Sequence, residues 1–195
     1  MLGNIIVAYN KKGSPLYARD FNIIGALMLL LKDALKPNLV QTIEGSPVLM
    51  HTGPFANIAH GSSSLIATRI ALGFCDYVIT EGGFGADLGF EKFMHIVARK
   101  AGFKISAVVV VVSLRALKYH GGLDLKDSAK LNIQALEKGC ANLAHHIGIV
   151  RKFGLEPVVC INRFAQDKIK EIEFLKKYCR DILKVDSAVS DVYQK

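Results

Sequence analysis

Short apolar runs alternate with amphipathic segments along most of this 195-residue chain. The runs are rich in β-branched residues and four to six residues long, which predicts buried strands. Between them apolar residues recur at helical spacing, and Leu136, Cys140, Leu143 and Ile147 would share one helix face. Alternating buried strands and helices predict an α/β fold, a parallel sheet with helices on both faces. We expect strands at 5–8, 48–51, 77–80, 107–112 and 158–161, the last four in one parallel sheet, and helices at 20–35, 90–101 and 127–153, with another beginning at the serines 62–64.

The length suggests one domain, or one domain with part of another. We expect residues 1–45, a strand followed by a helix, to be a remnant of an adjoining segment. Residues 46–195 would then form the parallel α/β core. The sequence shows no internal repeat and no low-complexity linker.

Composition narrows the class further. The chain is 51% hydrophobic with a mean hydropathy of +0.29, which is enough for a sizeable core. No apolar run reaches the ~18 residues of a membrane span, and no signal-peptide pattern opens the sequence. The four cysteines lack C-x-x-C spacing, which favours reduced, buried thiols. We therefore expect a cytoplasmic protein without a membrane partner.

The net charge of +8 raises the question of a nucleic-acid partner. However, the lysines are spread over predicted helix faces with acids between them, and no basic block carries interleaved aromatic residues. An anionic small molecule explains the excess charge as well, so we expect no nucleic-acid binding.

Polar or glycine-rich loops follow four of the predicted strands. These loops are 52–61, 81–89, 113–122 and 162–167. Because the carboxyl ends of parallel strands share one edge, we expect the four loops to converge on a ligand site.

Loop 81–89 is the most unusual of the four. Four glycines fall within eight residues, and Phe84 stands among them. Glycines allow main-chain N–H groups to approach a ligand. The Phe84 ring either stacks on that ligand or fills a neighbouring core, and the segment alone leaves both readings open.

Five segments resemble one family, formate–tetrahydrofolate ligase. They read KPNLVQT at 36–42, GPFANIAHG at 53–61, EGGFGADLG at 81–89, RALKYHGG at 115–122 and INRF at 161–164. They occur in the family's order, and the resemblance covers essentially the whole chain. The resemblance implies a P-loop NTPase-like core and an ATP-dependent ligase. Such an enzyme makes formyl phosphate from formate and transfers the formyl group to N10 of tetrahydrofolate.

One departure from the family pattern bears on activity. The chain contains no Gly-Lys dipeptide and hence no G-x-x-x-x-G-K-[ST] phosphate cradle. It resembles a middle section of the enzyme, so we expect it to need a P-loop-bearing remainder as a partner and to be inactive in isolation. The resemblance also implies homo-oligomers, and it implies ATP with Mg²⁺ and tetrahydrofolate as substrates rather than tightly bound cofactors. We expect no metal site.

The resemblance implies roles for individual residues, each with a structural alternative. Phe84 and Phe164 would stack on the pterin and Asp87 would accept from its N–H groups, with Tyr193 as a third aromatic near the chain terminus. The alternatives are core packing for the rings and a frayed terminal tyrosine. The remaining candidates are Asn57, His60 and Arg115 for catalysis, Asn162 for the nucleotide, and Lys118, His120 and Gly121 for an anion.

Three of these roles have specific competitors. Lys118 and its cationic neighbours could serve in structural pairing, Asn162 could cap a turn, and His60 could satisfy backbone carbonyls. For the chain as a whole, a non-catalytic folate- or anion-binding module or a split-enzyme subunit remains an alternative. A dinucleotide-binding domain is disfavoured, because no acid stands at the end of the next predicted strand to bind a ribose.

Overall fold

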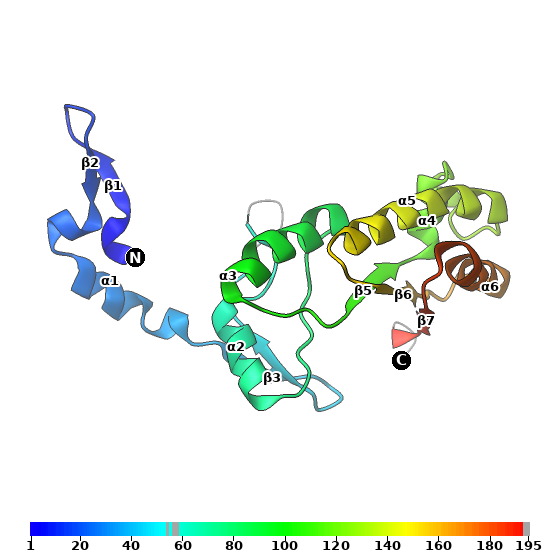
Figure 1. The fold of residues 1–195 in the computed structure, drawn as a ribbon, viewed down its shortest axis with the longest axis horizontal. Coiled ribbons are helices and arrows are strands. Elements are labelled where there is room, and N and C mark those ends of the chain that lie inside the picture. The colour runs from blue at the N-terminus through cyan, green and yellow to red at the C-terminus, as the bar shows by residue number, and fades with distance from the viewer. Residues whose placement is uncertain (54, 56–58, 193–195) are drawn as a thin grey trace. The chain divides into compact units, whose positions relative to one another are not determined.

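The computed structural model describes residues 1–53, 55 and 59–192, and the chain forms two compact units. The first unit contains residues 1–53 and 63–80 (Figure 1). The second contains the described residues among 54–62 together with 81–192. The boundary expected between residues 45 and 46 stays a prediction.

Two antiparallel hairpins make up the strands of the first unit. Strand β1 (Ile6–Tyr9) pairs with β2 (Pro15–Tyr17), and β3 (Asn38–Gln41) pairs with β4 (Pro47–Met50). The second hairpin closes through a turn in which Gly45 has φ +88°. The expectation that 48–51 joins a parallel sheet is therefore wrong, because this strand pairs locally with the one just before it.

Helices in the first unit are shorter than expected. The predicted helix 20–35 is divided into a 3₁₀ turn (Ala18–Phe21), α1 (Ile24–Leu31) and a second 3₁₀ turn (Asp33–Leu35). The first break follows from Asn22, whose φ of 53° is left-handed and ends the turn. Helix α2 (Leu65–Phe74) begins where the serines predict, since the Ser64 hydroxyl accepts from the Ala67 N–H at 3.0 Å.

The second unit contains a three-stranded parallel sheet in the order β5–β6–β7 (Figure 1). Strand β5 (Val108–Val112) pairs in parallel with β6 (Pro157–Asn162), which pairs in parallel with β7 (Ser187–Ser190). The α/β class with a parallel sheet is confirmed. The strand expected at 77–80 is absent: this segment pairs with no strand in the described part of the chain, and Tyr77 and Ile79 are exposed.

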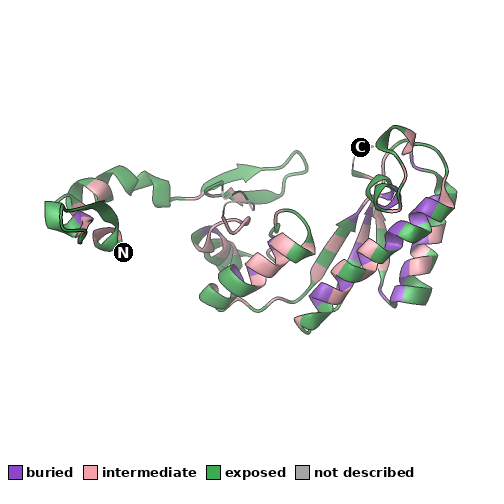
Figure 2. Ribbon diagram, turned by 90° about the horizontal axis from the view of Figure 1, so that it is seen from above, coloured by how far each residue is buried: buried purple, intermediate pink, exposed green. Residues whose placement is uncertain are grey.

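Helices pack on one face of this sheet. α4 (Leu114–His120), α5 (Ile133–Lys152) and α6 (Ile169–Tyr178) join the inward side chains of β5 and β6 in one apolar cluster. Val112, Val159 and Ile161 face this cluster and are buried, whereas Val109 and Val111, on the other face, are 60% and 64% exposed. Figure 2 shows that the buried residues gather on the helices and strands of this unit. The expected second layer of helices is not found among the described residues of this unit.

Two helix boundaries in this unit differ from prediction. The segment 113–122, expected as a loop, contains α4, whose first turn is capped by Ser113 accepting from the Ala116 N–H. Helix α5 begins at Ile133 rather than near 127, because the Asn132 side chain accepts from the Ala135 N–H at 2.9 Å and sets the start. Capping chemistry decided both boundaries.

A further helical segment runs from Ala86 to Ala101. It contains wide π-type turns at Ala86–Phe90 and Phe93–Ala98 and ends in α3 (Arg99–Ala101). The helix expected at 90–101 is confirmed, with a start four residues earlier. None of the helices in the described ranges is both long and apolar enough to cross a bilayer.

Candidate functional site

Loop 81–89 holds Phe84 in an unusual conformation. Its φ of 66° lies in the left-handed region, which is a genuine outlier for a bulky residue. Phe84 is 73% exposed, so no core built from the described residues explains the strain. Strain of this kind is kept where the surrounding structure over-determines it, and it collects at ligand sites.

The surroundings do over-determine the loop. The Gly83 N–H donates to the Gly61 carbonyl at 2.9 Å, which joins loop 81–89 to the end of loop 52–61. A Cβ on Gly89 would clash with the Gly83 carbonyl, so only glycine permits this closure. Lys92 adds a hydrogen bond from its Nζ to the Ala59 carbonyl at 2.8 Å. Phe84 is thus presented to solvent from a tightly closed backbone.

Asp87 stands three residues beyond Phe84, at the start of the helical segment. Its side chain is 61% exposed, and its Oδ1 lies 3.9 Å from Nδ1 of His146 on α5. The packing of this segment against α5 continues at Phe90, whose ring meets that of Phe153 edge to face at 5.2 Å. A carboxylate with free acceptor capacity therefore lies close in sequence to the exposed ring.

A second polar group lies at the carboxyl end of β6. Asn162 Oδ1 and Arg163 Nε are buried with no hydrogen-bond partner within the described ranges. Arg163 Nη1 pairs with Asp191 at 3.4 Å, and the Asp167 carboxylate accepts from the Phe164 N–H at 2.9 Å. Buried polar atoms without partners call for an explanation, and a ligand group is one.

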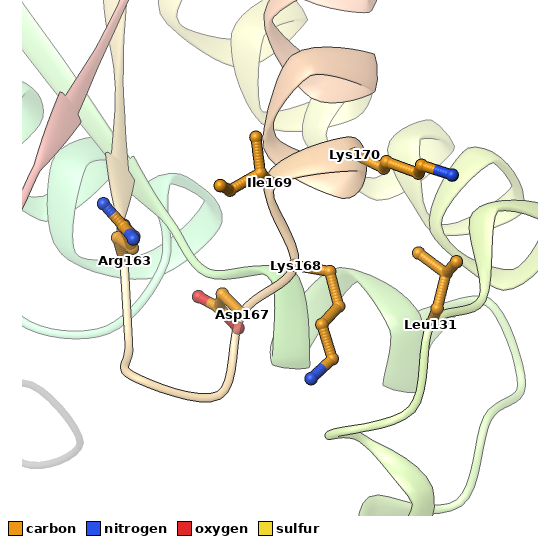
Figure 3. A pocket seen from close by; sticks show the side chains of 6 residues that line it. All are labelled: Leu131, Arg163, Asp167, Lys168, Ile169 and Lys170. Carbon is orange, nitrogen blue, oxygen red and sulfur yellow. The ribbon is translucent and has the colours of Figure 1, made fainter.

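The surface beside this group is hollowed, and three of its six lining side chains are cationic (Figure 3). The depression has a volume of about 550 Å³. A negatively charged group fits this setting better than a neutral one. Its lining residues are Leu131, Arg163, Asp167, Lys168, Ile169 and Lys170.

Lys118 has structural partners. Its side chain is 1% exposed, and its ammonium group donates to both carboxylate oxygens of Glu171, at 3.1 and 3.2 Å, and to the Lys130 carbonyl at 3.0 Å. Glu171 Oε1 also accepts from the Asn132 N–H at 2.8 Å. This network joins α4, α6 and the start of α5, which favours structural pairing for Lys118 over anion binding.

The neighbours of Lys118 have different surroundings. Arg115 and His120 are exposed on α4 and remain available to a ligand. Gly121 allows close packing, because a Cβ there would coincide with the Ala135 carbonyl of α5. It also lines a depression of about 310 Å³ that includes Lys138.

The expected convergence of all four loops is wrong. Loop 81–89 is bonded to Gly61, the residue after the half-buried His60, and its Asp87 lies near the carboxyl-terminal half of α5. Loop 162–167 and α4 lie at the other end of α5, where the Lys118–Glu171 network is found. Helix α5 has 20 residues and is therefore about 30 Å long. The loops separate because 77–80, the strand expected to precede loop 81–89, does not belong to the sheet.

Two candidates, Asn57 and Tyr193, lie outside the described residues. Conversely, the sequence reasoning gave no site role to three residues that the structure brings to the candidate groups. Arg163 was noted only as one of the polar residues of loop 162–167, beside Phe164, and His146 was interpreted as surface or core filling on the long helix. His146 and Glu171 had no local signal, because their partners lie 59 and 53 positions away in the sequence.

The fold is that of an α/β protein with a closed glycine-rich loop at residues 81–89 and cationic side chains beside the carboxyl end of β6. Comparison with known proteins gives the family. The sequence model of formate–tetrahydrofolate ligase matches residues 1–195. The chain belongs to the formate–tetrahydrofolate ligase family.

Individual relatives carry the name of the same family. The formate–tetrahydrofolate ligase of Bacillus licheniformis is 57% identical over 180 residues, which cover 92% of this chain and 32% of the relative. Those of Sinorhizobium fredii and Rhizobium rhizogenes are 54% and 56% identical over 93% and 91% of this chain, again 32% of each relative. The chain therefore spans about a third of the length of these curated relatives.

Proposed function

We propose that this chain is the segment of a formate–tetrahydrofolate ligase that supplies folate-binding residues. The complete enzyme would make 10-formyltetrahydrofolate from formate, ATP and tetrahydrofolate through formyl phosphate. The observation that carries the proposal is the family match over all 195 residues, with relatives that bear this name at more than 50% identity. Because the chain spans a third of those relatives, the activity belongs to an assembly with the remaining two thirds.

Phe84 is the residue we assign most directly to the pterin. An exposed ring in a strained, closed loop can stack on a flat heterocycle without reorganising on binding. Asp87 would accept from the N–H groups of the pterin. Phe164 and Tyr193 would add further aromatic surface, although Phe164 lies in a loop at the other end of α5 and needs its own test.

The phosphate chemistry would be shared with the rest of the assembly. Without a Gly-Lys dipeptide this chain has no P-loop lysine for the β- and γ-phosphates of Mg²⁺-ATP. Asn162, with its unpaired buried oxygen, would contact the nucleotide, and Asn57, His60 and Arg115 would face formyl phosphate. His120 and Gly121 would contact an anion. Lys118 is less suited to this role, because its ammonium group is already paired with Glu171.

The proposal extends to the setting of the protein. We place it in the cytoplasm, because four free cysteines, two of them buried, suit that compartment. Its partners would be the P-loop-bearing remainder of the enzyme and further copies of itself.

The test is the Phe84→Ala substitution in the assembled enzyme, this chain together with the remainder found in its relatives. The KM for tetrahydrofolate should rise about tenfold, the scale expected when stacking on one aromatic ring is lost, while the KM for ATP stays unchanged. Phe90→Leu is the matched control, because the Phe90 ring packs on Phe153 and its loss should lower stability rather than folate affinity.

The opposite pattern would reject the folate site. If Phe84→Ala keeps the folate constant and lowers only the melting temperature, the ring serves the fold. The family assignment would stand, and the folate-binding role of loop 81–89 would not.

A further inference from the structure

The ring of His146 has an unsatisfied nitrogen that faces Asp87. His146 lies on α5 and its side chain is 19% exposed. Its Nδ1 is buried and makes no hydrogen bond within the described ranges. The nearest acid is Asp87, with Oδ1 at 3.9 Å. An N–H to oxygen hydrogen bond is about 1 Å shorter, a gap that a small rotation of the exposed Asp87 side chain would close.

Gly85 allows these two side chains to lie next to each other. A Cβ at this position would lie 2.6 Å from Asp87 Oδ1 and 3.0 Å from His146 Cε1. Any other residue would crowd both side chains with its Cβ, so at least one of them would have to shift. Three residues from two separate elements thus form one compact group, with Gly85 and Asp87 in the glycine-rich segment and His146 on the long helix.

We propose that His146 is a positioning residue: its Nδ1–H donates to Oδ1 of Asp87 and holds the carboxylate with Oδ2 turned toward the N–H groups of the pterin. This inference rests on the proposed folate-binding role of Asp87. A carboxylate that accepts from the ligand through one oxygen is free to turn unless its other oxygen is also held. His146 supplies that second hold from a rigid helix.

Neighbouring groups do not offer the same contact. His145 is exposed, and its ring centroid lies 6.0 Å from that of His146. The ring centroid of His95 lies 5.0 Å from that of Phe153. This contact lies beyond Asp87 in the segment 86–101 and beyond His146 on α5. Among the described residues, His146 is therefore the one basic side chain that the structure pairs with Asp87.

The experiment uses steady-state kinetics of the assembled enzyme. Asp87→Ala should raise the KM for tetrahydrofolate about tenfold, and His146→Leu about fivefold, with little change in the KM for ATP. Adding His146→Leu to the Asp87→Ala enzyme should have no further effect, because the histidine acts through the acid. His145→Leu, on the same helix, is the control and should match the wild type.

A pair of conservative variants separates positioning from packing. The amide of asparagine can occupy the place of Nδ1, whereas that of glutamine reaches the place of Nε2. His146→Asn should therefore restore the folate constant to within about twofold of wild type, and His146→Gln should resemble His146→Leu. Because it does not depend on His146→Leu, the comparison of the asparagine and glutamine variants still tests the positioning role if His146→Leu fails to fold.

The outcomes are distinct. If Asp87→Ala raises the folate constant and the histidine variants do not, the positioning role is wrong and the folate site stands. If Phe84→Ala raises it and Asp87→Ala does not, Asp87 has no ligand role and the inference falls with it. If none of these variants changes it, the proposed function of the loop fails.

The tautomer of His146 gives a reading independent of turnover. Nitrogen-15 spectra of the 195-residue chain should show a proton on Nδ1 of His146. A bare Nδ1 with the proton on Nε2 alone would overturn the inference, because such a ring cannot donate to Asp87.

Discussion

The buried Lys118–Glu171 pair offers the sharpest test of how this fold is held together. Replacing Lys118 by Met keeps most of the side-chain volume and removes the ammonium group. Three hydrogen bonds are lost, two to Glu171 and one to the Lys130 carbonyl. The Glu171 carboxylate, which is 0% exposed, then keeps only the Asn132 N–H as a partner in the network.

The magnitude follows from burial. Removing one member of a buried ion pair leaves an uncompensated charge and costs about 3–5 kcal/mol. A domain is stable by about 5–15 kcal/mol in total, so the loss is a large share of it. For a chain of this length each kcal/mol lowers the melting temperature by about 2–4 °C, which predicts a fall of about 6–20 °C.

The assay is urea and thermal unfolding followed by far-ultraviolet circular dichroism. Lys126→Met is the matched control, because Lys126 is 76% exposed and pairs with an exposed Asp124, a contact worth less than about 1 kcal/mol. The double variant Lys118→Met/Glu171→Leu should recover much of the loss, since no charge is left buried. Recovery should be incomplete, because the Asn132 N–H and the Lys130 carbonyl lose their partners.

One result would refute this reasoning. If Lys118→Met unfolds within about 1 kcal/mol of wild type while the assembled enzyme loses affinity for its anionic substrates, Lys118 serves a ligand rather than the fold. That result would restore the anion-binding role expected from the sequence.

Three further predictions concern the chain by itself. The purified 195-residue chain should show no ATP hydrolysis dependent on formate and tetrahydrofolate, because it lacks a P-loop lysine; turnover at about 1 s⁻¹ or faster would show that phosphate binding had been misread. Burial raises the pKa of Cys140 to about 12 and that of Cys179 to about 11, so at pH 8 a thiol reagent should label the exposed Cys75 well before either. These folded-state pKa values lie above the unfolded value near 9, so the two protonated thiols stabilise the fold fully below pH 9, and this stabilisation is lost as the pH rises to about 12. Urea unfolding between pH 9 and pH 12 should show a falling free energy of unfolding. A constant free energy of unfolding over that range would contradict the prediction.

The sequence by itself determined the family, the α/β class and most of the local elements. Helix α5, the strands β5 and β6 and the start of α2 lie where periodicity and the capping serine predict them. These features depend on neighbouring residues, so a local pattern is enough to find them. The family motifs are local in the same sense, and they identified Phe84 and Asp87 as candidates.

Only the tertiary structure decided which residues meet. The run 77–80 has the composition of a strand, but a strand also needs a partner to pair with, and this run pairs with none of the described strands. Segment 48–51 does have a partner, but it pairs in an antiparallel hairpin and not in the parallel sheet. Lys118 carries the same charge whether it binds an anion or a buried acid, and it is Glu171, 53 residues away, that makes it structural. His146 likewise acquires a role only because Gly85 lets Asp87 approach it. Contacts between distant residues are set by packing, which no local pattern in the sequence records.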